Sequence, residues 1–222
     1  MKYAFAFAAM LASTGASAAV ISSSVGGVPV GANIYESFDA IGPGGTTASG
    51  ITVSFAGTDA GTASLPNVGG RYAAPYISGG NGTLFGNAQA DGQDATQYLT
   101  TGIGTVTLDL GDDHQYFGIL WGSVDTYNSL AFYAGDTLLF TYSGSDVAAI
   151  ANGDQGAAGT YYVNINSDTT FNKVVASSSG YAFEFDNVAL AYKPITDVPE
   201  PGALALFGLG AIGLAASRRR KG

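Results

Sequence analysis

Short segments in which apolar and polar residues alternate recur between residues 19 and 196. In Thr105–Leu110, "TVTLDL", the residues Val106, Leu108 and Leu110 share one face, which is the two-residue period of a β-strand. The segment Gln115–Val124 is apolar on both faces, which predicts a central strand covered on each side. No segment of this region keeps the 3.6-residue period of an amphipathic helix. The pattern therefore predicts an all-β domain.

The spacing of the other strand-like segments refines this prediction to an antiparallel β-sandwich with a jelly-roll-like topology, in which the first and last strands pair. Gly135 and Asp136 suit a tight hairpin turn, because glycine readily adopts a positive φ. Residues 57–97 are expected to form loops, since they contain the turn-rich stretches "SGGNGT" and "ADGQDATQ". The remaining predicted strands are Asn33–Phe38, Ile51–Phe55, Ser129–Tyr133, Thr137–Tyr142, Tyr161–Asn166, Phe171–Ser177 and Tyr181–Tyr192.

The first eighteen residues have the layout of a secretory signal peptide. Lys2 supplies a positive charge, an apolar stretch runs from Tyr3 to Leu11, and small residues follow from Ala16 to Ala18. The sequence therefore predicts cleavage between Ala18 and Ala19, with residues 1–18 removed. The alternative is a buried N-terminal helix.

The last residues form an apolar run that ends in a basic cluster. Gly202–Ser217 carries no charge, and as an α-helix this segment would be about 24 Å long, somewhat less than the roughly 30 Å of a bilayer core. Long basic side chains can reach back to the interface, so Arg218–Lys221 would end a single transmembrane helix on the cytoplasmic side. A buried core helix is the alternative. Both ends predict that the domain in between, residues 19–193, lies outside the cytoplasm, followed by a linker at residues 194–198.

Pro199, Glu200 and Pro201 precede the apolar run, and two prolines keep this peptide extended. The order of Pro-Glu-Pro box, hydrophobic span and basic end, which includes Arg218, Arg219 and Arg220, resembles the PEP-CTERM sorting signal of Gram-negative bacteria. This resemblance covers residues 199–222. It implies a transient inner-membrane anchor that an exosortase recognises and cuts, after export through the secretion translocon, so that the domain reaches the cell surface or extracellular matrix.

Removal of both ends makes the chain more acidic. The whole sequence has a net charge of −9, whereas residues 19–196 keep three basic and fifteen acidic residues, a net charge of −12. Such a domain repels nucleic acids and anionic lipids, and it either attracts divalent cations or uses its charge only for solubility. There is no cysteine, so stability has to come from the core or from a metal ion.

The last predicted strand contains an irregularity. Its apolar residues lie at odd positions from Tyr181 to Phe185 and at even positions from Val188 to Tyr192. A strand changes faces in this way only with an extra residue, which predicts a β-bulge at Asp186 and Asn187.

The segment Phe185–Val188 also resembles the closing strand of exported jelly-roll domains, where an aspartate implies a structural calcium shared with acids of the first strand. Here "YESFDA" supplies Glu36 and Asp39. If the terminal strands pair, we expect Glu36, Asp39 and Asp186 to bind calcium together with backbone carbonyls. The alternative is that Asp186 ends a strand and the two early acids are solvated.

The stretch "WGSVDTYN", Trp121–Asn128, resembles a Gly-Ser-x-Asp-x-Tyr-Asn segment of some PEP-CTERM surface proteins, a resemblance that concerns architecture only. Asp125 and Asn128 are expected to bond the backbone of a turn, with a ligand role as the alternative. Trp121 would suit a sugar-stacking platform, although its place in the most apolar strand favours core packing.

Catalytic motifs are scarce. The one histidine, His114, is predicted in an exposed turn, "GDDHQ", and there is neither a Gly-x-Ser-x-Gly motif nor a cysteine nucleophile. A glycosidase needs two carboxylates, for which Asp112 with Asp113, or Glu184 with Asp186, are candidates. We therefore expect a non-enzymatic exported protein of the cell surface or biofilm matrix. The alternatives are a carbohydrate-binding module for secreted polysaccharide and, after it, a glycan hydrolase.

Overall fold

The computed structural model describes residues 19–194. The predicted signal peptide, most of the linker and the whole sorting signal lie outside the described residues. None of the helices within residues 19–194 is long and apolar enough to cross a membrane. The elements are β1 (Ala19–Ser24), β2 (Ile34–Glu36), η1 (Phe38–Ala40), β3 (Gly45–Thr46), β4 (Thr52–Gly57), β5 (Gly61–Ala63), β6 (Tyr76–Ile77), η2 (Thr83–Phe85), β7 (Gly92–Gln93), β8 (Tyr98–Thr101), β9 (Gly104–Gly122), β10 (Asn128–Ala134), β11 (Thr137–Ser143), α1 (Gly144–Val147), η3 (Ala157–Gly159), β12 (Tyr161–Ser178) and β13 (Phe183–Ala191).

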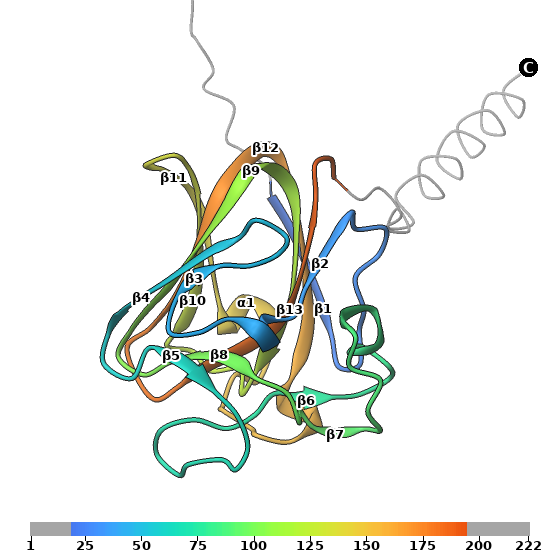
Figure 1. Cartoon of the computed structure of the whole chain (residues 1–222), viewed down its shortest axis with the longest axis vertical. Coiled ribbons are helices and arrows are strands. Elements are labelled where there is room, and N and C mark those ends of the chain that lie inside the picture. Colours follow the sequence, from blue (N-terminus) through green and yellow to red (C-terminus); the bar gives the residue numbers. More distant parts are fainter. Residues whose placement is uncertain (1–18, 195–222) are drawn as a thin grey trace, which may run out of the picture.

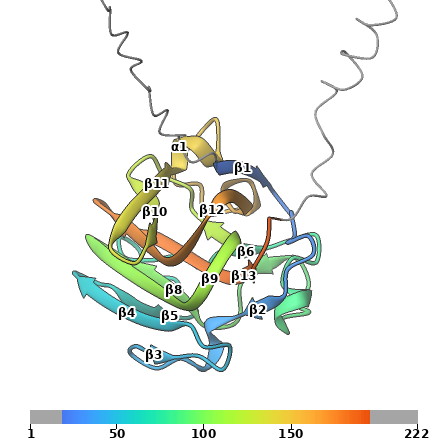
Figure 2. The same cartoon turned by 90° about the horizontal axis from the view of Figure 1, so that it is seen from above.

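Antiparallel strand pairs join eleven strands into one sheet that curves around the core (Figures 1 and 2). Its main path follows the order β11-β10-β12-β9-β13-β8-β5, with β1, β2 and β4 attached beside it and β3 paired to β4. β6 and β7 form a separate small sheet. The predicted all-β class is confirmed. A sandwich would have two separate sheets as its layers. Here the long strands β9 and β12 pass from one layer to the other, so both layers belong to one sheet.

β9 and β12 were each expected as two shorter strands. The structure keeps β9 continuous from Gly104 to Gly122, and β12 pairs with it along most of its length. Gly111 adopts a φ of +77° inside β9, so the strand bends there without ending. His114 is paired with Phe171 and is fully buried, so the predicted exposed turn is wrong.

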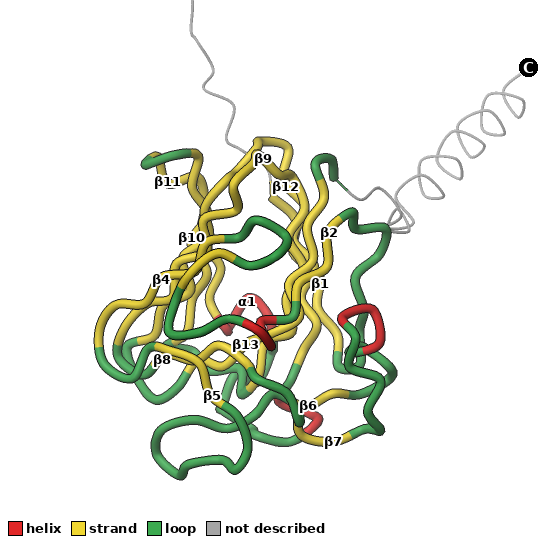
Figure 3. Tube along the Cα trace, viewed as in Figure 1, coloured by secondary structure: helices red, strands yellow, loops and turns green. Residues whose placement is uncertain are grey.

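The core lies on the concave side of this sheet and is rich in aromatic residues. Alternate residues of β9, among them Phe117, Ile119 and Trp121, point into it and have no exposed surface. The opposite face of β9, which carries Tyr116 and Leu120, packs against Ile77 and Phe85. These two residues belong to the long loop region between β5 and β8 (Figure 3). The central strand is therefore covered on both sides, as its sequence predicts.

Three local predictions are confirmed. The strand predicted at Asn33–Phe38 forms β2 and pairs with the last strand, β13, with Glu36 opposite Val188, while β1, which precedes it, pairs with β12. The register of β13 against β9 shifts between Asp186 and Ala189, and Asn187 has a φ of +53°, which identifies the expected bulge. The hairpin of β10 and β11 turns at Gly135 with a φ of +58°.

Candidate functional site

The bulge in β13 turns Asp186 toward the first strands. The Asp186 side chain is fully buried, and its Oδ1 accepts a hydrogen bond from the backbone N–H of Phe38 at 3.3 Å. Its Oδ2 has no hydrogen-bond partner among residues 19–194. Burial is the main cause that raises the pKa of Asp186 well above its usual range, and the nearby Asp94 carboxylate adds to the shift. Asp186 is therefore a buried acid that lacks a partner for one oxygen.

The other two predicted calcium ligands do not join it. The Glu36 carboxylate accepts a hydrogen bond from the Ser49 hydroxyl at 2.5 Å, and Asp39 is exposed and accepts one from Ser37 at 2.9 Å. Within the described chain, no group of three or more His, Cys, Asp or Glu side chains is placed to hold a metal ion. The structure thus brings Asp186 close to the first strands, as expected, but does not gather the three carboxylates into one set of ligands.

The sequence interpretation overlooked Asp94. This residue is fully buried, and its Oδ1 accepts hydrogen bonds from Asn87 Nδ2 at 2.9 Å, from the Thr96 N–H at 3.0 Å and from the Thr96 hydroxyl at 2.7 Å. Its Oδ2 has no partner in the described region. The Asp-x-Thr spacing in "ADGQDATQ" could have indicated that Asp94 holds a turn, because an aspartate often accepts a hydrogen bond from the backbone two residues later. Its burial depends on distant strands and cannot be read from the loop.

The three predicted ligand residues of "WGSVDTYN" are all buried. Trp121 is 0% exposed and stacks on Phe183 with 4.4 Å between ring centroids, so it cannot form a sugar platform. Asn128 donates from Nδ2 to the carbonyl of Ala182 at 3.0 Å. The Asp125 backbone carbonyl accepts from the Asn128 N–H at 3.3 Å, which closes the turn. Trp121 packs in the core and the Asn128 side chain bonds backbone, as the sequence favoured, whereas Asp125 closes the turn through its backbone carbonyl.

Glu184, a candidate acid for glycan hydrolysis, is also buried. The side chain is 2% exposed, and its Oε1 accepts from the Ala73 N–H at 2.9 Å. Burial raises the pKa of Glu184 to about 7, while the hydrogen bond from the Ala73 N–H opposes the shift. A raised pKa suits a general acid, but this carboxyl lies under the loop that carries Ala73 and is closed to a polysaccharide.

A group of mostly exposed side chains lies near β5 and β8. We define it as the tyrosine edge, which consists of Asp59, Arg71, Ile103, Tyr127 and Tyr181. Tyr127 is 36% exposed and Tyr181 is 38% exposed. The Tyr127 hydroxyl donates to the backbone carbonyl of Tyr181, and the Tyr181 hydroxyl donates to Asp59 Oδ2, both at 2.7 Å. Arg71 forms an ion pair with the same carboxylate.

Glycines lie under both rings of this edge. A Cβ atom added to Gly180 would come within 3.1 Å of two Tyr127 ring atoms, and one added to Gly102 would come within 2.5 Å of the Tyr181 ring. One side of each ring therefore packs directly on backbone. The hydrogen bonds to Tyr181 and Arg71, in that order, lower the pKa of the Asp59 carboxyl, which keeps it ionised.

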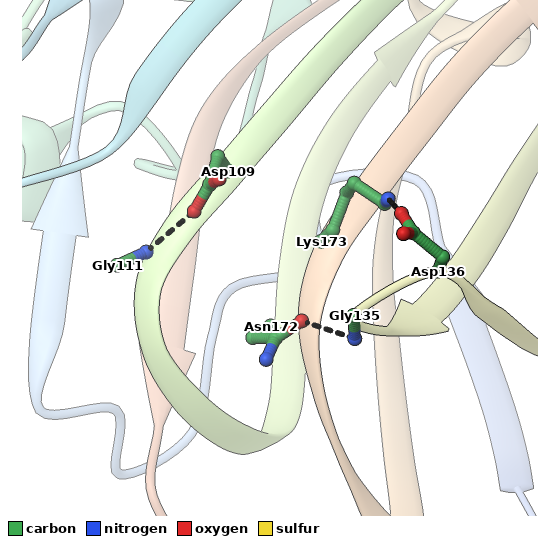
Figure 4. Close-up of a pocket in the computed structure, with 6 residues that line it drawn as sticks. All are labelled: Asp109, Gly111, Gly135, Asp136, Asn172 and Lys173. Atoms are coloured by element: carbon green, nitrogen blue, oxygen red, sulfur yellow. Dashed lines mark hydrogen bonds and ion pairs between the residues drawn. The ribbon is translucent and has the colours of Figure 1, made fainter.

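A polar depression of about 260 Å³ lies where β9 and β12 bend beside the β10–β11 turn (Figure 4). Its polar groups bind one another. Lys173 Nζ contacts Asp136 Oδ1 at 3.0 Å, and the Gly135 N–H donates to Asn172 Oδ1 at 2.9 Å. Asp109 accepts from the Gly111 N–H at 3.2 Å. Few of these groups remain for a ligand.

Residues 197–221 match the PEP-CTERM protein-sorting motif. No curated protein and no solved structure matches the chain. The motif identifies the chain as an exported protein that an exosortase sorts to the cell surface by way of a membrane-anchored stage.

Proposed function

We propose that the β-domain is a non-catalytic component of the cell surface or extracellular matrix that acts in adhesion or matrix structure. The sorting motif carries this proposal, because it gives the domain an extracellular destination. The acidic charge of residues 19–196 fits a soluble exported domain that avoids anionic lipids. Of the candidate catalytic groups, His114, Glu184 and Asp186 are buried, which supports a non-catalytic role, whereas Asp112 and Asp113 are exposed.

Mass spectrometry of the protein recovered from its own organism tests the sorting route. We expect the envelope or matrix form to begin at Ala19 and to lack Arg218–Lys221. Replacement of Pro199 and Pro201 by alanine should leave the intact tail in the membrane fraction, while the control Lys193→Ala, outside the motif, should be processed normally. A wild-type matrix form that keeps its basic end would contradict the proposed release.

Deletion of the gene tests the role of the domain. We expect cells without the protein to form less adherent biofilm, and the wild-type gene to restore it. The unprocessed Pro199→Ala, Pro201→Ala variant should not restore it. Normal biofilm in the deletion strain would rule out the adhesion role.

A carbohydrate-binding module is the second candidate function, and the tyrosine edge favours it. Exposed aromatic rings beside an ionised carboxylate and a guanidinium are suited to a sugar surface. Release of reducing ends from a polysaccharide by the pure protein would favour the glycan hydrolase instead.

We also propose that a structural calcium ion binds between Asp94 and Asp186. Each of these buried carboxylates has one oxygen without a partner in the described chain, and unpaired buried carboxylates are costly. Calcium takes carboxylate and backbone carbonyl oxygens, so it would satisfy both. Asp94 replaces Glu36 in this set, because the Glu36 carboxylate is already bonded to Ser49.

A further inference from the structure

We infer that the tyrosine edge is a binding site for a neutral polysaccharide chain. This inference rests on the proposed function, since it names the ligand that a matrix protein would hold. The site differs from the predicted tryptophan platform, because Trp121 is buried in the core whereas Tyr127 and Tyr181 are exposed.

The two tyrosine rings are fixed in place before a ligand arrives. Each hydroxyl is held by a hydrogen bond of 2.7 Å, and one side of each ring packs on glycine backbone. Binding therefore costs little side-chain entropy, which a mobile surface tyrosine would lose. The free part of each ring gives a flat apolar surface next to polar groups, which matches a sugar ring with its apolar C–H face and its hydroxyl rim.

Two charged groups, the Asp59 carboxylate and the Arg71 guanidinium, lie beside the rings. Asp59 accepts hydrogen bonds only, and Arg71 donates only, so together they can serve both parts of a sugar hydroxyl. The Arg71 side chain keeps 52% of its surface exposed and lies 5.9 Å from the centre of the Tyr72 ring. Its remaining N–H groups are therefore accessible at the border of the edge.

Charge selects a neutral ligand. The mature domain carries a net charge of −12. Arg71 is the one basic residue of the tyrosine edge, and Asp59 neutralises it. An anionic polysaccharide would meet repulsion over most of the domain, whereas a neutral one would not.

The polar depression is a weaker binding surface by the same criteria. No aromatic residue of the described chain lines it, and the lining residue Lys173 lies over the Tyr133 ring, with its Nζ 5.1 Å from the ring centre. The tyrosine edge therefore offers stacking surface that the depression lacks.

Affinity electrophoresis of the purified protein tests the inference. Native gels containing dextran, xyloglucan or β-glucan serve as neutral probes, and an alginate gel serves as the anionic probe. We expect at least one neutral gel to retard the wild type, and Tyr127→Ala and Tyr181→Ala each to weaken that binding at least tenfold. Tyr35→Ala is the matched control, because Tyr35 has the same 36% exposure as Tyr127 but lies on β2 beside Phe85.

Hydrogen exchange of the wild type, with and without the bound polysaccharide, gives a second readout that needs no variant. Protection should appear at residues 102–103, 127 and 180–181. Migration unchanged in all neutral gels, retardation by alginate alone, or equal retardation of the tyrosine variants and wild type would each overturn the inference. Surface localisation of the wild type, measured separately, shows whether the proposed function survives such a failure.

Discussion

Replacement of Glu184 by glutamine should change how stability depends on pH. The carboxyl is 2% exposed, and its pKa in the folded protein is about 7, against 4.5 for the unperturbed group. A raised carboxyl pKa means that the folded state binds the proton more tightly than the unfolded state. The stabilisation from Glu184 is therefore complete below about pH 4.5 and is lost as the pH rises through 7.

The size of this effect follows from the two pKa values. Each unit of difference corresponds to about 1.4 kcal/mol, so ionisation of Glu184 costs the folded state about 3 kcal/mol at pH 8 relative to pH 4.5. Glutamine stays neutral over this range, and its amide oxygen can still accept from the Ala73 N–H. We expect Glu184→Gln to be more stable than the wild type at pH 8 by about 1–3 kcal/mol, and this advantage to be smaller by about 2.5 kcal/mol at pH 5.

Urea unfolding of the purified protein at several pH values between 5 and 8.5 measures this difference. Asp136→Asn is the matched control, since it makes the same chemical change at a fully exposed carboxylate. Other buried acids, such as Asp186, are present in the wild type and in both variants. The difference in unfolding free energy between Glu184→Gln and the wild type therefore isolates the contribution of Glu184. A stability difference that is the same at pH 5 and pH 8 would refute the reasoning.

Three further predictions follow from buried groups. Trp121→Ala should lower the free energy of unfolding by about 3–5 kcal/mol in urea titrations, because it removes a stacked core ring. In calorimetry, calcium should raise the melting temperature of the wild type, and EDTA should reverse the rise. Asp94→Asn should remove this response to calcium. A wild type whose melting temperature does not respond to calcium would rule out the site. His114 should titrate below pH 6.5 in NMR spectra, because burial lowers its pKa, and its protonation should destabilise the fold as the pH falls.

Local patterns in the sequence were sufficient to predict much of the fold. Alternation identified the first part of β9, at Thr105–Leu110, and the change of faces in β13 located the bulge at Asp186 and Asn187. The bend in β9 was interpreted as a turn, because "GDDHQ" has the composition of a loop. Its pairing with β12 overrides that composition, since Phe171 opposite His114 belongs to the buried core.

The candidate site was less predictable, because burial there comes from segments far apart in the chain. Ala73 meets Glu184 over 111 residues, and Phe38 meets Asp186 over 148 residues. Nothing within residues 64–97 indicates that this region covers the outer face of β9 and β13. The sequence therefore could not show that Asp94 is buried and Asp39 exposed.

The stretch "WGSVDTYN" shows how buried and exposed roles divide within one segment. Its most polar residues, Asp125 and Asn128, do not face a ligand, because they hold the turn and bond the backbone beside β13. That turn fixes the position of Tyr127, whose ring lies on Gly180 and whose hydroxyl reaches Tyr181. The geometry needed for recognition would thus come from residues that never touch the ligand. Loss of Asn128 should therefore weaken binding indirectly, by releasing Tyr127 from its fixed position.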